Sequence, residues 1–236
     1  MGWATAKKNE LKPWAVKQWV IAEPSAEFVC AMEEVLDVYE LPYTEEHPVV
    51  CLDESPHQLI GEVRKRFTDT HGVAHIDYEY SRQGVAEVYM ICEPKAGKRF
   101  IEVKDNHNSQ QWAEMIAYVA EELYGNARHI TLVEDNLSAH RKAALYEVYA
   151  PQRARAILER ITFVHTPKHG SWLNVAEIEL SVLNRVALKK RMESKEKFLE
   201  QIKAYEQLKN HQAIPIDWQF TTKDARTKLK KLYPNV

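Results

Sequence analysis

The sequence predicts an α/β fold in which a mixed five-stranded sheet is flanked by helices on both faces. A strand pattern at 48–54 is followed by a hairpin pattern at 85–92 and 98–104, which together predict three antiparallel strands. Helical and strand patterns then alternate up to residue 165, and strands linked by helices pair in parallel. With 236 residues and 45% hydrophobic content, the chain can bury one substantial core.

The N-terminal third contains one well-defined helix before the first strand. Apolar residues recur at helical spacing behind Ser25, a residue type that caps helices, and predict a helix over 26–40. These residues are Phe28, Met32, Val35, Leu36 and Tyr39. The stretch 56–83 is poorly patterned because proline and glycine interrupt it, so only short strands near 59–65 and 75–80 are expected there.

The rest of the chain alternates helices and strands. Asn108, followed three residues later by Gln111, is a capping-box pattern that begins a helix, and this helix is expected to stop at Gly125. The remaining elements are predicted in chain order: a strand at 129–134, a helix near 138–149, a short helix at 152–160, a strand at 161–165, helices at 175–190 and 195–210, an extended segment at 214–220, and a helix to about 232.

These patterns divide the chain into three segments. We expect an N-terminal linker and helix over 1–45, a main domain over 46–212, and a basic tail over 213–236 that packs on the domain. The tail belongs to a basic C-terminal quarter: residues 182–236 contain 13 Lys and Arg against 6 Asp and Glu, while the rest of the chain contains 19 against 28. Such a quarter can supply a phosphate-binding face even though the net charge is −2, but a set of solvated helix faces explains it equally well.

Nothing in the sequence indicates a membrane or secreted protein. No apolar run approaches membrane-spanning length, and no apolar stretch follows the basic N-terminus as it does in a secretory signal. Cys30, Cys51 and Cys92 are far apart and form no CxxC pair. We therefore expect reduced thiols in the core of a cytoplasmic protein, without zinc ligation.

Three carboxylates carry the strongest functional signal. Asp53 closes the apolar run before it, Asp135 closes the strand pattern at 129–134, and Glu177 lies at the start of a predicted helix. Acids delivered to one place repel each other and need a cation between them. Carboxylate oxygens are the ligands that Mg2+ or Mn2+ uses in phosphoryl-transfer chemistry, so the leading interpretation is a metal-dependent nuclease or polynucleotidyl transferase.

The order of elements is that of an RNase H-like fold. In that arrangement the strands at 48–54 and 129–134 lie side by side in the middle of the sheet. Asp53 and Asp135 then project next to each other, and the helix at 175–190 brings the third acid over them.

Three sequence blocks resemble the catalytic blocks of DDE transposases, in the bacterial insertion-sequence branch of the mariner-related superfamily. The blocks are VVCLDE at 49–54, LVEDNLSAH at 132–140 and TPKHGSWLNVAE at 166–177. The combination DNxxxH followed by SWLNxxE is specific, whereas an isolated acidic pair is not. The resemblance extends from about Lys8 to the C-terminus and includes HIDYEY at 75–80.

The resemblance implies a mechanism and partners. Two Mg2+ or Mn2+ ions per site would be bound by Asp53, Asp135 and Glu177, with Asp53 bridging both ions, and would cut DNA at transposon ends and join it to target DNA. Holding two ends together implies a homodimer. A bacterial enzyme of this kind is expected in the cytoplasm, associated with the nucleoid.

The residues around these acids have competing interpretations. Asn136 suits a helix cap better than a metal ligand, and His140 either faces the active site or packs its helix. Trp172 is expected in the core, where it and Asn174 support the loop that orients the third acid. Glu54 and Glu134 are expected not to bind metal, because they alternate to the other side of their strands.

Several basic residues are candidate DNA contacts. Lys168 and His169 lie in the third block, before the loop that orients Glu177, and are expected near a phosphate, with a purely structural role equally open. Arg185, Lys189, Lys190 and Arg191 are the candidates in the basic quarter.

Relatives of this kind carry N-terminal helix-turn-helix modules, and here the match begins almost at Met1, so we expect those modules to be missing. Three hypotheses therefore remain: a transposase catalytic domain, another nuclease of the RNase H fold acting on a structured nucleic acid, and a truncated, non-enzymatic remnant that binds DNA or a partner.

Overall fold

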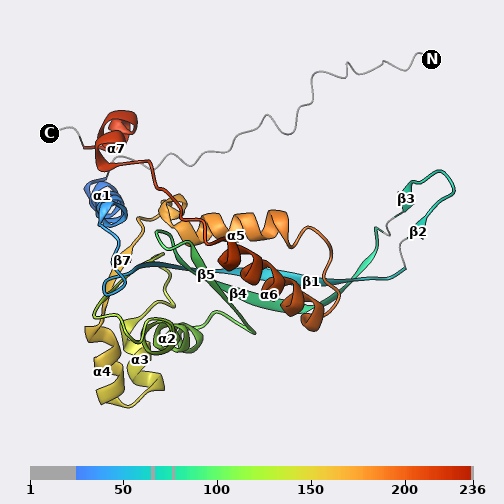
Figure 1. Cartoon of the computed structure of the whole chain (residues 1–236), viewed down its shortest axis with the longest axis horizontal. Helices are drawn as coiled ribbons and strands as arrows, with labels where there is room; N and C mark the ends of the chain where they lie inside the picture. Colours follow the sequence, from blue (N-terminus) through green and yellow to red (C-terminus); the bar gives the residue numbers. More distant parts are fainter. Residues whose placement is uncertain (1–24, 65–66, 76–77, 235–236) are drawn as a thin grey trace.

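The computed structural model of the chain describes residues 25–64, 67–75 and 78–234. At its centre lies a five-stranded sheet in the order β5-β4-β1-β6-β7 (Figure 1). The strands are β1 (Val49–Glu62), β4 (Tyr80–Glu93), β5 (Lys98–Lys104), β6 (Ile130–Glu134) and β7 (Ile161–His165). β4 pairs antiparallel with β1 and β5, whereas β6 pairs in parallel with β1 and β7. The predicted mixed sheet is confirmed.

Helices cover both faces of this sheet (Figure 1). One face, called the α5 face, packs against α1 (Ala26–Glu40), α5 (Val175–Val186), α6 (Lys195–Gln212) and α7 (Thr222–Lys228). The other, called the α2 face, packs against α2 (Ser109–Ala117), the π-helical turn η2 (Tyr118–Leu123), α3 (Lys142–Val148) and α4 (Pro151–Glu159). Successive residues of β1 alternate between the two clusters, since Cys51 lies in the first and Leu52 in the second. In the described part of the chain, no helix has the length and apolar character needed to cross a membrane.

The helix starts follow the capping chemistry predicted from the sequence. The hydroxyl of Ser25 accepts a hydrogen bond from the backbone N–H of Phe28 at the start of α1, and α1 buries the predicted apolar face. The side chain of Asn108 accepts one from the backbone N–H of Gln111, at 2.9 Å, at the start of α2. Both predicted helices are confirmed.

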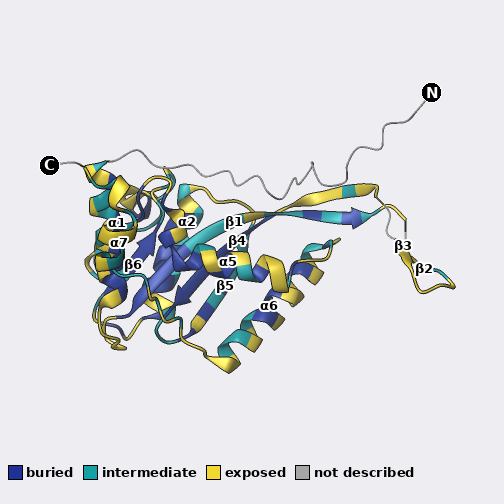
Figure 2. Ribbon diagram, turned by 90° about the horizontal axis from the view of Figure 1, so that it is seen from above, coloured by how far each residue is buried: buried dark blue, intermediate teal, exposed yellow. Residues whose placement is uncertain are grey.

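The first strand is much longer than predicted. β1 continues past Asp53 to Glu62 and pairs with β4 along this whole length, with one register shift between Gln58 and Ile60. The two strands form an arm that projects beyond the helices (Figure 2), and β2 (Phe67–Thr68) pairs with β3 (Ala74–His75) near its tip. The expectation of separate short strands at 59–65 and 75–80 is therefore wrong.

Pro56 explains why the arm could not be predicted from the sequence, because proline is uncommon inside paired strands. The β1–β6 ladder ends at Cys51, so beyond that point β1 pairs on one side only. Pro56 lies in this part of the strand, opposite Glu87, and a residue without an N–H is tolerated where one edge of a strand is unpaired. Of the HIDYEY motif at 75–80, Ile76 and Asp77 lie outside the described residues.

The C-terminal segment returns to the first helix. In α7, the Arg226 guanidinium pairs with the Glu33 carboxylate of α1 at 2.7 Å, and the Thr222 hydroxyl donates to Asp37 at 2.7 Å. Residues of both helices belong to the same hydrophobic cluster as β1 and α5. The boundaries predicted at 45/46 and 212/213 remain predictions.

The cysteines divide between core and surface. Cys51 and Cys92 are buried and free, as predicted, whereas Cys30 is exposed. The prediction of a core thiol is wrong for Cys30, because this residue lies on the outward side of α1, next to the exposed positions of that helix.

A buried ion pair joins α5 to the edge of the sheet. The guanidinium of Arg99 in β5 donates two hydrogen bonds to the Glu179 carboxylate, at 2.9 and 3.2 Å, and both side chains are almost inaccessible. Arg99 also donates to the backbone carbonyl groups of Gly97 and Ile214. Glu179 thus points away from Glu177, as its place two residues further along the helix predicts.

Breaking this pair should strongly destabilise the fold. We expect Glu179→Ala to lower the free energy of unfolding by about 3–5 kcal/mol, because it leaves the Arg99 charge buried without its partner. Urea denaturation measures the change. Arg155→Ala, which removes an exposed pair with Glu159, is the control and should leave the midpoint almost unchanged. Equal midpoints for the two variants would contradict the prediction.

Candidate active site

Two of the three predicted carboxylates leave adjacent parallel strands at the same level. The β1–β6 ladder ends with the pair Cys51 and Val133. Asp53 and Asp135 each lie two residues beyond this pair. Residues two apart along a strand share a face, and neighbouring strands are about 4.8 Å apart, so the backbone directs both carboxylates to the α5 face, side by side.

The third carboxylate arrives from above this face. Glu177 lies in the first turn of α5, which packs over β1 and β4. Its Oε2 atom is buried and has no hydrogen-bond partner among the described residues. An acid oxygen left in this state calls for a cation, because a buried charge without a partner is costly.

The ionisation of Asp53 reports how close these acids lie. Burial raises the pKa of Asp53, and the negative charges of Glu54, Asp135 and Glu177 raise it further, to about 7. All three predicted acids therefore interact electrostatically in one place. A divalent cation between them would reverse this effect by favouring the carboxylate form.

His140 forms a buried bridge between two of the acids. Its Nε2 atom lies 3.0 Å from Oε1 of Glu54, and its Nδ1 atom lies 3.0 Å from Oδ1 of Asp135. Burial lowers the pKa of His140, but the hydrogen bonds with Asp135 and Glu54 and the charges of Glu134 and Glu54 outweigh it and raise the pKa to about 11. His140 is therefore an imidazolium that donates from both ring nitrogens.

Glu54 contacts His140, and its predicted exclusion from metal binding stays a prediction. Its side chain does alternate away from that of Asp53, but the turn at 136–141 places His140 on that side of β1 and links the two acids. Within the described residues, the ligand atoms of Glu54, Asp135 and His140 lie within 4.8 Å of one another, but an imidazolium has no lone pair for a metal. Because the His140 imidazolium already balances charge there, the stronger demand for a metal lies with Asp53 and Glu177.

A second layer holds His140 in place. The Trp112 ring of α2 stacks on the imidazole with centroids 5.8 Å apart, and its Nε1 atom donates to Oε2 of Glu134 at 2.9 Å. Glu134 is fully buried and lies on the α2 face of β6, as the alternation along the strand predicts, and its exclusion from metal binding stays a prediction. The sequence does not reveal this role of Trp112, because its hydrogen-bond partner comes from another element.

Asn174 fixes the start of the helix that carries Glu177. Its Oδ1 atom accepts a hydrogen bond from the N–H of Ala176 at 3.0 Å, and its Nδ2 atom donates to the carbonyl oxygen of Leu52 at 2.8 Å. The residue is completely buried. One side chain therefore caps α5 and ties it to β1 directly before Asp53.

Two neighbours differ from their predicted roles. Trp172 is 42% exposed and makes an edge contact with Phe220, so the prediction of a core residue is wrong: the helical turn at Ser171–Leu173 buries Leu173 instead. Asn136 does not cap a helix, because α3 starts only at Lys142 and Arg141 occupies its N-cap.

The predicted DNA-contacting residues fall in two places. Lys168 and His169 are exposed and line a pocket next to Asn136. Arg185, Lys189 and Lys190 are exposed at the end of α5 and in the segment after it, which then runs along the arm: Arg191 donates to the carbonyl oxygen of Glu79 and lies over the ring of Tyr80. The structure does not bring these two groups together.

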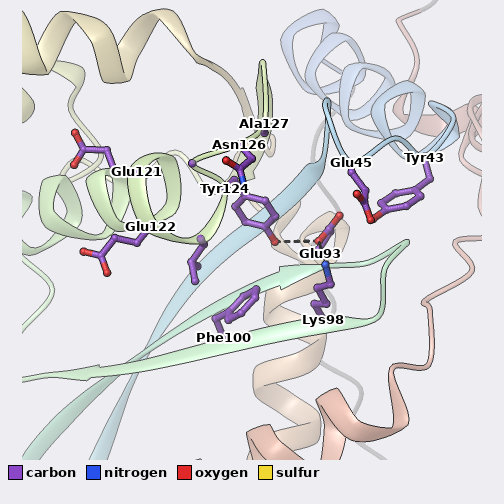
Figure 3. Close-up of a pocket in the computed structure, with 12 residues that line it drawn as sticks. Tyr43, Glu45, Glu93, Lys98, Phe100, Glu121, Glu122, Tyr124, Asn126 and Ala127 are labelled. Carbon is purple, nitrogen blue, oxygen red and sulfur yellow. Dashed lines mark hydrogen bonds and ion pairs between the residues drawn. The ribbon is translucent and has the colours of Figure 1, made fainter.

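Another pocket, of about 380 Å3, lies where β4 turns into β5 and contains none of the predicted site residues (Figure 3). The Glu93 carboxylate points towards the Tyr124 hydroxyl, which donates to it at 3.3 Å (Figure 3). Glu93 lies beside the start of β1, whereas Asp53 lies further along that strand. This pocket is therefore separate from the carboxylate site.

Metal binding should depend on pH through Asp53. Because its pKa in the fold is above the usual 3.8, the proton on Asp53 stabilises the metal-free fold fully below about pH 3.8, and this contribution is lost as pH rises to about 7. Mg2+ or Mn2+ binds the deprotonated form. We expect the metal-induced rise in Tm, measured by differential scanning fluorimetry, to be larger at pH 8 than at pH 6. The rise should shrink in Asp53→Asn, and an equal rise at both pH values would contradict the prediction.

Removal of His140 should destabilise the metal-free protein more than the metal-loaded one. His140→Ala leaves the buried Glu54 and the partly exposed Asp135 without their shared cation, and we expect a loss of about 3–5 kcal/mol in the free energy of unfolding. Saturating Mn2+ should offset part of that loss. Urea denaturation with and without Mn2+ measures both effects, with the exposed His211→Ala as control. A loss unaffected by metal would show that His140 serves packing alone.

Comparison with known proteins adds independent findings. The sequence profile of the DDE superfamily endonucleases matches residues 48–199, which is more than half of the chain and includes all three carboxylates. Among curated protein sequences, none matches the chain.

Solved structures of Mos1 transposase share the fold. The Mos1 transposase paired-end complex with left transposon end has a TM-score of 0.52 at 15% identity, covering 85% of this chain and 60% of that chain. The Mos1 mariner paired end complexes with Mn and with Mg both have a TM-score of 0.54, at 14% and 15% identity, and each covers 92% of this chain and 64% of the Mos1 chain. The chain thus spans less than two thirds of the length of these proteins, and the predicted RNase H-like fold is confirmed. Since the profile covers most of the chain and the fold agrees with it, the chain belongs to the DDE superfamily endonuclease family.

Proposed function

We propose that this chain is the catalytic domain of a DDE transposase from an insertion element, which cuts DNA strands at the element's ends and transfers them to target DNA. The observation that carries the proposal is the convergence of Asp53, Asp135 and Glu177 at one end of the parallel strands. Burial raises the pKa of Asp53, and the charges of Glu54, Asp135 and Glu177 raise it further. An acid oxygen of Glu177 is buried without a partner among the described residues.

The donor set fits Mg2+ or Mn2+. All three side chains supply hard oxygen atoms, and such ions prefer oxygen ligands. Asp53, Asp135 and Glu177 would together hold the ions. When bound, the ions activate a water or 3′-hydroxyl and stabilise the leaving oxygen in an in-line displacement at phosphorus.

The surrounding residues orient these ligands. His140 donates to Asp135 and so fixes which carboxylate oxygen is left for an ion. Asn174 aims Glu177 by capping its helix. Lys168, His169 and the basic residues between Arg185 and Arg191 are the proposed phosphate contacts.

The proposed partners are double-stranded DNA, both transposon ends and target, and a second copy of the chain in the active complex. The Mos1 structures support this proposal, because all three are paired-end complexes and one of them contains a left transposon end. A place among the nucleoid DNA of a bacterial cytoplasm follows from such substrates.

Nicking of supercoiled plasmid DNA tests the enzymatic part of the proposal. We expect the purified chain to nick the plasmid with Mn2+ and not without it. Asp53→Asn, Asp135→Asn and Glu177→Gln should each reduce nicking by at least about a hundredfold, the scale for losing one stabilising group at a reacting centre. Asp105→Asn, which changes a well-exposed acid, is the matched control. Equal nicking by all variants would indicate a contaminating nuclease.

Cleavage position tests the transposase part. With an end-recognition module supplied in fusion, cuts should concentrate at the element's inverted-repeat ends. Cuts that follow DNA structure and ignore these ends would favour a different nuclease with the same fold. A chain that binds DNA without cutting it would favour a non-enzymatic remnant.

A further inference from the structure

The pocket at the turn from β4 into β5 is separate from the carboxylate site and has its own chemistry (Figure 3). Its volume of about 380 Å3 falls in the range of ligand pockets, about 300–1,000 Å3. Three segments form its walls: residues 43–45 before β1, the ends of β4 and β5 at their turn, and the stretch from η2 to residue 127. π-Helical turns such as η2 are rare and frequently occur at functional sites.

Hydrogen bonds hold these walls in place. The Arg160 guanidinium donates to four backbone carbonyl groups within residues 120–127, at 2.6–3.2 Å. The backbone N–H of Arg128 donates to the carbonyl oxygen of Glu46 at 2.8 Å, which ties the segment before β1 to the same loop. A ligand would therefore meet a pocket that is already formed, and this reduces the ordering cost of binding.

The pocket carries an excess of negative charge. Its charged lining consists of four carboxylates and one ammonium group, those of Glu45, Glu93, Glu121, Glu122 and Lys98. Glu121 pairs with Arg153 at 2.6 Å, whereas Glu45 and Glu122 form no ion pair within the described residues. Negative charge of this kind repels phosphate and attracts cations, so the pocket suits a cationic ligand and not DNA.

Glu93 is the acid at the base of the pocket, and its contacts within the chain are long. Its side chain is only 3% exposed. The Tyr124 hydroxyl donates to it at 3.3 Å (Figure 3), and the Lys98 ammonium group lies 3.9 Å away. Burial raises the pKa of Glu93 more than these contacts lower it. A cation with several N–H donors would stabilise this carboxylate better, because charge-assisted hydrogen bonds are short and strong.

Aromatic rings supply the apolar part of the pocket. The rings of Phe100 and Tyr124 form an edge contact with centroids 6.3 Å apart, and Tyr43 lies beside Glu45 (Figure 3). A cation over a ring face is attracted by the electrons of the ring. Guanidinium combines both requirements, since it stacks on rings, donates to carboxylates from five N–H groups and is more weakly hydrated than ammonium.

The spacing of the acids argues against a metal ion in this pocket. In the part of the chain that the structure describes, no three of these carboxylates offer oxygen atoms within 4.8 Å of one another. Divalent ions need several oxygen ligands at about 2.0–2.6 Å. Acids spread around aromatic rings are better matched to a larger, planar cation.

We propose that this pocket binds a guanidinium group, which stacks on Phe100 and donates hydrogen bonds to Glu93 and to the acids at the rim, Glu45 and Glu122. An arginine side chain of a polypeptide and a small guanidine compound share this chemistry. The inference goes beyond the proposed function and does not depend on it, because none of the residues assigned to DNA cleavage lines the pocket.

Binding of Nα-acetyl-arginine amide tests the proposal, with Nα-acetyl-citrulline amide as the matched control. Citrulline keeps the length and shape of arginine, but its end group is uncharged. In ligand-observed NMR titrations of the full chain, the arginine compound should bind at least about tenfold more tightly, because ring stacking and charge-assisted hydrogen bonds both favour the cation. Equal binding of the two compounds, or no binding of the arginine compound, would overturn the proposal.

Three variants locate the effect. Glu122→Gln, at an exposed position, and Phe100→Leu, which keeps an apolar side chain, should each remove most of the preference for arginine over citrulline. Glu200→Gln removes an exposed acid of α6 outside the pocket and should keep it. A preference retained in both Glu122→Gln and Phe100→Leu would place binding elsewhere and contradict the proposal.

A peptide and a free compound distinguish the two sources of the group. The probes are the peptide Gly-Ser-Arg-Ser-Gly and methylguanidine. Tighter binding of the peptide, lost in Glu122→Gln, assigns the pocket to an arginine of a polypeptide partner. Equal binding of both probes, lost in the same variant, assigns it to a small guanidine compound. Binding of neither would overturn the proposal.

Discussion

The mutual repulsion of four carboxylates is the constraint on which the rest of this structure depends. Asp53, Glu54, Asp135 and Glu177 interact within one region, and like charges that close are unstable in a partly buried site. The fold itself reduces part of this repulsion, because the His140 imidazolium lies between the carboxylates of Glu54 and Asp135. The repulsion between Asp53 and Glu177 remains, and a proton or a metal ion would relieve it. A site that is incomplete in this way is suited to bind a cation strongly.

The pairing of β1 with β6 and the position of α5 bring these acids together. Parallel pairing of β1 with β6 in a fixed register sets two acids side by side, and Asn174 ties the start of α5 to β1. The Arg99–Glu179 pair anchors the same helix to β5. β1 then continues past the acids into the arm (Figure 2), while the pocket beside Asn136 opens on the β7 side. DNA placed at the acids would therefore meet protein on both sides.

Features encoded by short-range patterns could be predicted from the sequence. The five-stranded sheet follows from strand and helix periodicities, and the starts of α1 and α2 follow from Ser25 and Asn108, whose side chains cap the helix next to them. The three acids were recognisable because each interrupts an apolar pattern at the end of a strand or the start of a helix. Such signals need only neighbours along the chain, and the sequence contains them directly.

Features that depend on a distant partner could not be predicted. β1 tolerates Pro56 because its other edge is unpaired, a fact of sheet order. The alternation of side chains along β1 correctly predicts that Glu54 points away from Asp53. His140, from a turn more than 80 residues further along the chain, nevertheless contacts Glu54 and links it to Asp135. Trp172 is exposed because the turn containing it buries Leu173. Which elements form, and which acids end them, depends on local periodicity and capping, and these can be read along the chain. Which charges meet depends on distance in space and therefore emerges only in the folded protein.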